Sequence, residues 1–555
     1  TDATDPHAEQ ASRRPLTKLG PSGSIAMRAH RWSAMVTGVV LLVSSCGWSP
    51  RPEPDRAVIT GAYASLLADS EDLGSSDAAD TSVTVGLRDA ARPAVLFDWA
   101  TARRLSVRWR PGESWAIVEG RADDVARAFD VPIHDYRGRK GQVFYASGRQ
   151  PAVPQALSGG VVDVGRILGY TPHHMARPSI FPLDVPMQGL APDQLLTVYN
   201  AKPLVEQGYT GKGATIVFFE FDGFAQSDLD DFADSSDLPP FTPVLVGGDP
   251  GPPHGETVMD LEVAHAIAPD ARLVVVDARP TVEGSGAYEK VGEMFRAADR
   301  DHPGAVWSLS IGWSCDAFPT AMDLAPIRSA LTLAQSHGTT AFDASGDNGG
   351  LECKGGDNWS APPGPGDIGL DAVASIPEMT SVGGTTLSTD ADGRWLAEQA
   401  WSDGPLSQGS SGGVSRLYDR PDHQRNVSTD RDGTHRLAPD VAAVADPFTG
   451  VRIVYNGRPH IGAGTSQAAP IWAALTVLMN QYLAAHGGRP LGDLNPLLYR
   501  VAAGSALPGF RDMSVGGNAV DHAAPGYDTV TGLGSPNADN LARVLLDAQR
   551  EAIPR

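Results

Sequence analysis

Short apolar runs alternate with helical patterns from about residue 193 onward, and this alternation limits the possible folds most. The run at 214–219 is almost continuously apolar, as is typical of a parallel strand buried on both faces. The predicted helices end at proline or glycine. Together the elements predict an α/β fold with a doubly wound parallel sheet and helices on both faces. The predicted strands are 214–219, 271–276, 306–311 and one from 339, and the helices are 256–268 and 326–337.

A smaller α/β unit is predicted within residues 47–165. Residues 114–118 and 142–146 have strand patterns, and apolar residues recur at helical spacing over 122–129. These elements predict a compact open-faced sandwich. Residues 166–192 are rich in proline, which interrupts helices and sheet ladders, so we expect an exposed linker that is open to proteolysis.

Residues 1–46 have the features of an export signal. After an upstream segment at 1–26, basic residues precede an apolar run at 34–43, and small residues lead to Cys46. The run is shorter than the about 20 residues that span a bilayer. Val43-Ser-Ser-Cys46 resembles a bacterial lipobox, whose cysteine is acylated. We expect a bacterial protein that is secreted or attached to the cell envelope through a lipidated Cys46, with plain secretion as the alternative.

The other two cysteines are Cys315 and Cys353. Export would place them in an oxidising environment, which favours a disulfide. Two buried thiols are the alternative, because the sequence does not give the distance between them. No CxxC pair occurs in the chain, so a zinc-thiolate site is not expected.

The charge balance restricts the partners of the chain. Asp and Glu number 66 against 44 Lys and Arg, which gives a formal net charge of −22. Such a surface repels a phosphate backbone, so nucleic acid is not an expected partner. The acidic excess has two explanations: solubility, or work at acidic pH, where protonation of carboxylates relieves their repulsion.

Ser466 has the surroundings of a candidate nucleophile. Glycines at 462 and 464 precede it, and the apolar stretch that follows predicts a helix to about Leu483. The serine therefore lies at a helix N-terminus, where backbone N–H groups can stabilise an oxyanion. A helix N-cap without catalytic role is the alternative. Ala468 excludes the G-x-S-x-G elbow of α/β-hydrolases.

Two carboxylates could handle the proton of such a serine, and a third could stabilise its oxyanion. Glu256 and Asp260 are four residues apart on a predicted helix and share a face, so their repulsion favours retention of a proton and raises the pKa of the pair. Asp347 follows a buried strand in a Gly-rich loop, where a protonated carboxyl could donate to an oxyanion. Solvated surface carboxylates and an Asp-Gly turn are the structural alternatives.

Taken in the order of the chain, the segments that contain Glu256, Asp347 and Ser466 resemble the motifs of the sedolisin family of serine-carboxyl peptidases. The resemblance covers about 193–545, and residues 57–165 resemble the activation prodomain of that family. The matching motifs are Gly255-Glu256-x-x-x-Asp260, Ser345-Gly346-Asp347-x-Gly349 and Gly464-Thr465-Ser466-x-x-x-Pro470.

The resemblance implies a subtilisin-like fold for 193–555 and hydrolysis of polypeptides by an acid-acting endopeptidase or tripeptidyl-peptidase. Glu256 would take the proton of Ser466, Asp260 would support Glu256, and Asp347 would stabilise the oxyanion. It further implies a zymogen that removes its prodomain by autocatalysis, with a cut that we expect between about 180 and 195. We expect a monomer with activity highest at about pH 3–5.

A calcium site near the C-terminus is also implied by the resemblance. Asp512 and Asp528 would bind through their side chains, and Met513, Ala524 and Gly526 through backbone oxygens. An all-oxygen set suits a hard cation that takes roughly six to eight ligands. An Asp-Gly loop without a metal is the alternative.

One position departs from the family pattern. Members often extend the acid network with a glutamate after the first strand, which Glu220 matches, and a tryptophan after the third strand. Ile311 stands at the second position, and Trp313 follows two residues later. The extended network is therefore in doubt, whereas the central acids are present.

Two other functions match parts of the sequence. His254 and Asp222 lie in segments that resemble the histidine and aspartate motifs of ordinary subtilisins, and a His254 base would move activity to neutral or alkaline pH. Against this, subtilisins have Asn where Asp347 stands. The second alternative is a binding protein on an inactive peptidase scaffold, although the complete set of serine and carboxylates argues against it.

Overall fold

The computed structural model describes residues 57–175, 181–182, 189–248, 250–354, 363–404, 407–429, 433–505 and 507–551. The predicted signal and Cys46 lie outside these residues. Among the helices that the structure describes, none combines the length and the apolar character needed to cross a lipid bilayer.

A mostly parallel sheet forms the centre of the C-terminal region. Neighbouring strands of this sheet are parallel, except that residues 380–389 pair antiparallel with residues 395–400. In sheet order the strands are β11 (Val244–Val246), β12 (Arg272–Asp277), β10 (Thr215–Glu220), β13 (Val306–Leu309), β15 (Thr340–Ala344), β16 (Thr380–Thr389) and β17 (Trp395–Ala400), with β22 (Val441–Val444) also paired to β16.

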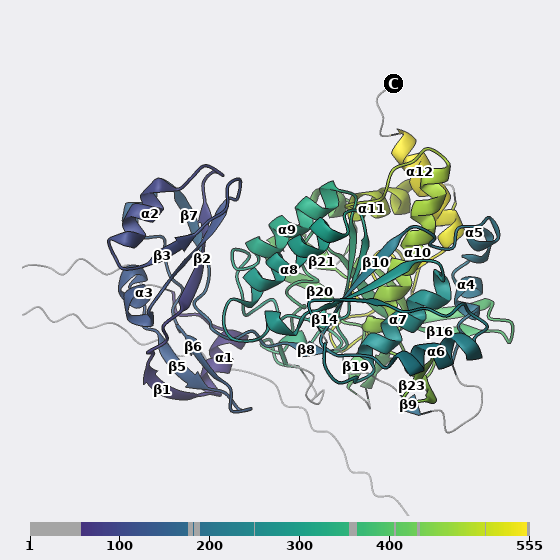
Figure 1. Ribbon diagram of the computed structural model, residues 1–555, viewed down its shortest axis with the longest axis horizontal. Helices are drawn as coiled ribbons and strands as arrows, with labels where there is room; N and C mark the ends of the chain where they lie inside the picture. The colour runs from purple at the N-terminus through teal and green to yellow at the C-terminus, as the bar shows by residue number, and fades with distance from the viewer. Residues whose placement is uncertain are drawn as a thin grey trace, which may run out of the picture. The chain divides into compact units, whose positions relative to one another are not determined.

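Helices cover both faces of this sheet (Figure 1). On one face, Ile216 and Phe218 of β10 share a core with α7 (Glu256–Ile267) and α10 (Thr465–Ala485). On the other, Val217 and Phe219 share a core with α8 (Ala287–Asp301) and α9 (Ala325–Ser336). A strand buried on both faces has no polar alternation, which explains the continuous apolar run. The predicted doubly wound α/β fold is confirmed.

Smaller elements complete the C-terminal region. The helices are α4 (Gln194–Val198), α5 (Lys202–Glu206), α6 (Gln226–Ser235), α11 (Asn495–Gly504) and α12 (Ala538–Glu551). The short strands are β8 (His174–Met175), β9 (Phe181–Pro182), β14 (Ile311–Gly312), β18 (Ser402–Asp403), β19 (Gln408–Gly409), β20 (Gly413–Asp419), β21 (His435–Ala438), β23 (Arg452–Tyr455), β24 (Arg458–Ile461), β25 (Phe510–Arg511) and β26 (Ser535–Pro536).

The carboxyl ends of the central strands lead to several predicted site residues. The direction in which successive strands are added to the sheet reverses at β10, which has β12 on one side and β13 on the other. Open α/β sheets bind ligands where the strand order reverses, beyond the carboxyl ends of the strands. Asp347 follows β15. The strand predicted at 306–311 is interrupted, because β13 ends at Leu309 and Ser310 separates it from β14.

The N-terminal module, residues 57–167, has its own hydrophobic core and two antiparallel sheets. The strands predicted at 114–118 and 142–146 are confirmed but belong to different sheets. One sheet has the order β3 (Ser106–Arg108), β4 (Trp115–Gly120), β2 (Thr81–Leu87) and β7 (Val161–Val164); the other has β1 (Glu71–Ser75), β5 (His134–Arg137) and β6 (Val143–Ala146). The helices are α1 (Ala62–Ala68), α2 (Ala94–Thr101) and α3 (Ala122–Phe129).

Ion pairs with helix α8 connect this module to the C-terminal region. We call them the α8 ion pairs. Beside them, Trp115 donates its indole N–H to Ser329 Oγ at 3.3 Å. The α8 ion pairs are Arg108–Glu289, Arg110–Glu293 and Glu113–Arg296.

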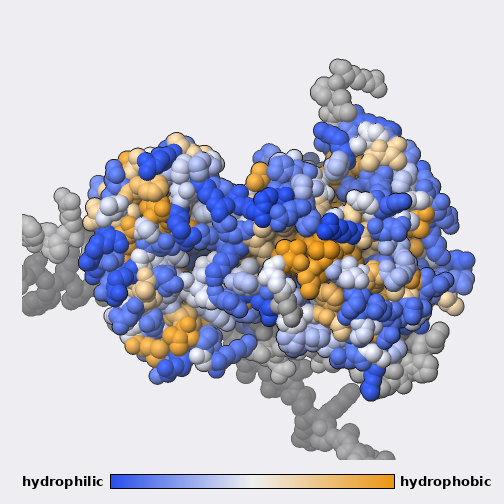
Figure 2. Space-filling view, in the orientation of Figure 1, coloured by the Kyte–Doolittle hydropathy of each residue, from blue (hydrophilic) through white to orange (hydrophobic). Residues whose placement is uncertain are grey.

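The surface and the cysteines agree with the composition. Hydrophilic residues predominate on the face seen in Figure 2, with smaller hydrophobic patches between them. Cys315 and Cys353 form a disulfide, which confirms the favoured pairing. The disulfide links the segment after β14 to the loop that carries Asp347.

Candidate active site

Helix α10 begins one residue before the predicted nucleophile. Its N-cap is Gly464, whose φ of 92° is unfavourable for other residues, and a Cβ there would lie 2.7 Å from Asp347 Oδ2. Ser466 is fully buried. Its hydroxyl donates to the carbonyl oxygen of Ser310 at a donor–acceptor distance of 3.5 Å, a weak bond.

Glu256 and Asp260 are buried at the N-terminal half of α7, with exposed fractions of 1% and 0%. Every residue of this helix is buried, so neither carboxyl faces bulk water. The Ser466 hydroxyl is close enough to Glu256 to lower the pKa of that carboxyl, although the two do not form a hydrogen bond in this arrangement. The structure therefore brings the predicted nucleophile and the predicted base together.

Burial and mutual repulsion dominate the electrostatics of these acids. Burial first, and then the charge of Asp260, raises the pKa of Glu256 well above its ordinary value. Burial also raises the pKa of Asp260, against the hydrogen bond from the Ser310 hydroxyl. Glu220, at the end of β10, has its pKa raised by burial and by both neighbours. The cluster therefore holds protons at pH values where isolated carboxyls are ionised.

Asp347 is fixed to the first residue of α10. Its Oδ1 accepts hydrogen bonds from the backbone N–H of Thr465 at 2.7 Å and from the Thr465 hydroxyl at 2.8 Å. The backbone N–H of Gly346 donates to the same hydroxyl at 3.1 Å. The loop after β15 and the N-terminus of α10 thus form one unit, with Asp347 adjacent to Ser466 in space.

Ser310 is a site residue that the sequence patterns did not indicate. Its hydroxyl lies 2.5 Å from Asp260 Oδ2 and 3.1 Å from the backbone oxygen of Ser466. Trp313 instead donates its indole N–H to Thr281 Oγ1 at 3.0 Å. A periodicity that predicts one continuous strand gives no sign of a break at Ser310, so the only signal in this segment is Ile311 in place of the expected tryptophan.

The residues of the subtilisin alternative have other contacts. Asp222 is buried and accepts hydrogen bonds from the backbone N–H groups of His254 at 2.6 Å and Thr257 at 3.1 Å, and so anchors the start of α7. His254 is exposed, whereas Glu256 is buried beside Ser466. This geometry favours a carboxyl over an imidazole as the partner of the serine.

The two carboxylates of the predicted calcium site reach the same loop. Asp512 Oδ2 accepts from the backbone N–H of Gly526 at 2.8 Å, and Asp528 Oδ2 from that of Ala524 at 3.4 Å. Burial raises the pKa of Asp528 to about 6. The two carboxylates are oxygen donors of the kind that Ca²⁺ prefers, and they reach the loop of residues 524–528. The residues present therefore fit this ion.

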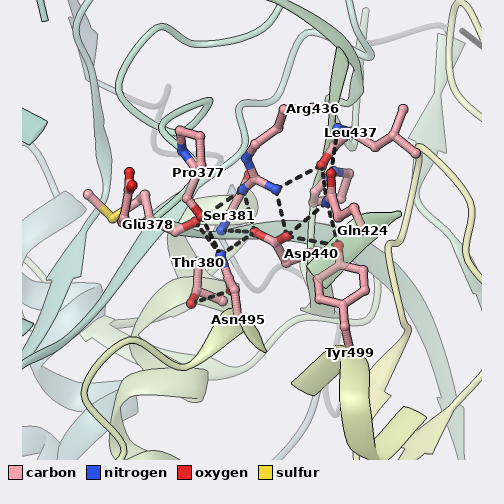
Figure 3. A network of polar contacts seen from close by, with 12 residues as sticks. Pro377, Glu378, Thr380, Ser381, Gln424, Arg436, Leu437, Asp440, Asn495 and Tyr499 are labelled. Atoms are coloured by element: carbon pink, nitrogen blue, oxygen red, sulfur yellow. Dashed lines mark hydrogen bonds and ion pairs between the residues drawn. The ribbon is translucent and has the colours of Figure 1, made fainter. Parts of the chain in front are cut away.

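A buried polar network lies next to that loop (Figure 3). Arg436 and Asp440 are fully buried and form a two-point ion pair, with distances of 2.8 and 2.6 Å. Asp440 also accepts from Tyr499 at 2.9 Å. The neighbouring Pro439 accepts a hydrogen bond from Tyr527 at 2.9 Å. A buried ion pair needs such additional partners, and here they tie the loop to the sheet.

Comparisons with known proteins agree on one family. The chain is 30% identical over 473 residues to kumamolisin of Bacillus sp. (strain MN-32), covering 79% of this chain and 80% of kumamolisin. It is 26% identical over 464 residues to sedolisin of Pseudomonas sp. (strain 101), covering 78% and 75%. Tripeptidyl-peptidase 1 of Homo sapiens is 30% identical over 263 residues, covering 44% and 43%.

A solved structure supports the fold. Pseudomonas sedolisin, complexed with two molecules of pseudo-iodotyrostatin, matches with a TM-score of 0.55 at 23% identity, covering 65% of this chain and 98% of that chain. No protein-family model matches the chain. The long alignment with kumamolisin and this subtilisin-like fold lead to one conclusion: the chain belongs to the sedolisin family of serine-carboxyl peptidases, which act on polypeptides as endopeptidases or tripeptidyl-peptidases.

Proposed function

We propose that the chain is an exported, acid-acting peptidase that is made as a zymogen and cleaves peptide bonds through an acyl-enzyme on Ser466. One observation carries this proposal: Ser466 is buried next to Glu256 and adjacent to Asp347. Few surroundings other than a catalytic centre would justify burying so many carboxyls beside one serine.

The mechanism starts with proton transfer. The Ser466 hydroxyl turns from the Ser310 carbonyl to Glu256, gives its proton to that carboxylate, and its oxygen attacks the peptide carbonyl carbon. Protonated Asp347, oriented by Thr465, donates to the oxyanion. Glu256 then protonates the leaving amine as the C–N bond breaks. Water attacks the acyl-enzyme, which releases the new carboxyl group and regenerates the hydroxyl.

Acidic pH suits both roles. Glu256 must accept a proton, whereas Asp347 must carry one, and the second condition favours acidic pH. Asp260, whose pKa is raised by burial, can share a proton with Glu256 and hold it in place. We propose highest activity at about pH 3–5.

Two contacts support the zymogen. Strand β8, from the 166–192 linker, pairs antiparallel with β14, which begins directly after Ser310. An extended substrate would add to a strand edge in the same way, so this segment would have to leave before substrates bind. The α8 ion pairs hold the N-terminal module in the precursor and would have to break before the module leaves. We propose that the chain then cuts itself C-terminal to β8, between about 180 and 195.

The remaining proposals rest on residues already described. Ca²⁺ would be held by Asp512 and Asp528 with the backbone oxygens of Met513, Ala524 and Gly526, and it would stabilise this loop. The signal at 1–46 supports secretion, with attachment to the envelope if Cys46 is lipidated. We propose that the mature enzyme is a monomer.

The test is acid incubation of the purified precursor followed by N-terminal sequencing. Wild type should shorten and then cleave a denatured protein, whereas Ser466→Ala should stay at full length. Glu256→Gln should also abolish turnover, and His254→Ala should retain most of it. Turnover that survives Glu256→Gln but is lost in His254→Ala would contradict the carboxyl mechanism.

A further inference from the structure

Ser310 occupies a break between two strands at the centre of the acid cluster. It follows β13 and precedes β14, and its exposed fraction is 1%. Its hydroxyl lies within hydrogen-bond distance of two groups, Asp260 Oδ2 at 2.5 Å and the backbone oxygen of Ser466 at 3.1 Å. In return, its own carbonyl oxygen accepts from the Ser466 hydroxyl.

One hydroxyl has one proton, so the two contacts are not equal. The distance of 2.5 Å to a carboxyl oxygen is typical of a charge-assisted O–H···O⁻ bond, whereas 3.1 Å to a neutral carbonyl is long for this donor. The proton therefore points mainly to Asp260. The contact with the Ser466 carbonyl keeps the hydroxyl oxygen of Ser310 near the N-terminus of α10.

We infer that Ser310 is a positioning residue of the reaction, because its hydroxyl holds Asp260 in the orientation that supports Glu256 and links that acid to the backbone of the nucleophile. The inference rests on the proposed function and adds a residue to it. Neither Ile311 nor Trp313 supplies this contact: Ile311 has no donor in its side chain, and Trp313 donates to Thr281.

The titratable groups that act on Asp260 are acidic. Glu220 approaches from β10, Glu256 from its own helix, and Asp222 from the segment after β10. Asp347 acts on Glu256 from the loop after β15. Against these acids, the Ser310 hydroxyl is a neutral donor that stabilises the charged form of Asp260. Its removal would leave the buried carboxylate with less compensation, so the acids would hold their shared proton to higher pH.

The experiment uses the mature enzyme and compares Ser310→Ala with Ser308→Ala. Ser308 is a matched control because it lies on β13, is fully buried, and its hydroxyl has no hydrogen-bond partner among the described residues. Initial rates on a peptide substrate give kcat and KM across the acid range. Ser310→Ala should lose about tenfold in kcat, with KM changed less than about twofold, because one charge-assisted bond is lost.

The pH profile separates positioning from packing. In Ser310→Ala the rising limb of kcat should move to higher pH, and in Ser308→Ala it should stay at the wild-type position. Ser310→Thr, which keeps a hydroxyl, should restore the profile. Ser310→Cys, which is close to serine in size but has a weaker donor, should shift the rising limb of kcat in the same direction as Ser310→Ala but by less. If Ser310→Ala does not mature, the profile of Ser310→Cys tests the positioning role of Ser310.

An unshifted profile in Ser310→Ala and Ser310→Cys would overturn the inference, as would an equal shift in Ser308→Ala. Failure of the proposed function is distinguishable, because it would leave the wild-type protein without acid peptidase activity. An active wild type with an unshifted Ser310→Ala profile would overturn the role of Ser310 alone.

Discussion

Asp347 and Thr465 are joined by two hydrogen bonds to a single carboxyl oxygen, one from the backbone N–H and one from the hydroxyl. Thr465→Val removes the second and keeps the first. We expect a loss of about tenfold in kcat, because Asp347 would be held in the orientation proposed for oxyanion stabilisation by one donor rather than two. Thr465→Ser should retain most of the rate. Steady-state kinetics at acidic pH would check this, and equal rates in both variants would contradict it.

Gly464 has a conformation and surroundings that exclude a side chain. Its φ is 92°, and an added Cβ would lie 2.7 Å from Asp347 Oδ2. Gly464→Ala should therefore lower kcat/KM by about a hundredfold or more, because a displacement of about 1 Å at a reacting group can reduce the rate by that factor. Gly457→Ala is the control, because Gly457 also has a positive φ but no atom within 4 Å of an added Cβ. Similar losses in both would show that backbone strain alone is responsible.

The sequence placed the acid pair on one helix face and Ser466 at a helix start because each placement depends on local spacing. Glu256 and Asp260 share a helix face at any tilt of that helix, and Ser466 follows a glycine that only a tight turn requires. Ser310 could not be predicted in this way. Its position depends on where β13 ends, and hydrogen bonds from neighbouring strands and helices decide that, not apolar periodicity.

The N-terminal module shows the same limit on a larger scale. Strands β4 and β6 were predicted, yet nothing local indicated that they belong to different sheets, because antiparallel partners are chosen by contacts distant in sequence. Strand β7 lies near the proline-rich linker and was not predicted, since its pairing with β2 is what makes it a strand.

Glu220 gives a test of stability against pH. Burial raises its pKa well above the ordinary 4.5, so the neutral form is favoured in the folded protein. Its contribution to stability is complete below 4.5 and is lost as pH rises through the folded pKa. In the Ser466→Ala precursor, which avoids autolysis, Tm should fall between acid and neutral pH, and Glu220→Gln should reduce that fall.

His423 acts in the opposite sense, because burial lowers its pKa to about 4. The change of Tm with pH in either protein alone therefore combines both groups. The difference in Tm between Glu220→Gln and its parent at each pH gives the contribution of Glu220. Glu283→Gln, at an exposed position, is the control and should leave the curve unchanged. Parallel curves for Glu220→Gln and the parent would refute the prediction.

Calcium removal should destabilise the loop around Asp528. A ligand present at about 100 times its Kd stabilises a folded protein by about 2.7 kcal/mol, so a chelator should lower Tm and added Ca²⁺ should restore it. Asp512→Asn should abolish the response to both. Asp547→Asn, at an exposed site on α12, should keep it. A wild-type Tm that does not respond to the chelator would argue for a metal-free loop.

The α8 ion pairs should control when the precursor matures. Glu289 and Glu293 face Arg108 and Arg110 of the N-terminal module, and each pair is partly exposed, so none is strong alone. Reversal of both glutamates, in Glu289→Arg with Glu293→Arg, replaces attraction by repulsion. This precursor should lose its module faster than wild type at a given acidic pH and should begin to mature at a higher pH.

A charge swap tests whether the effect comes from these contacts. Arg108→Glu with Arg110→Glu, added to the reversed precursor, should return maturation toward the wild-type rate because the pairs are restored with opposite signs. Asp301→Arg, at an exposed position on the same helix, changes the net charge without facing those arginines and should leave the rate unchanged. Precursor and product can be followed by gel electrophoresis over time. If Asp301→Arg accelerated maturation as much as the double reversal, overall charge would explain the effect, and the α8 ion pairs would have no specific role.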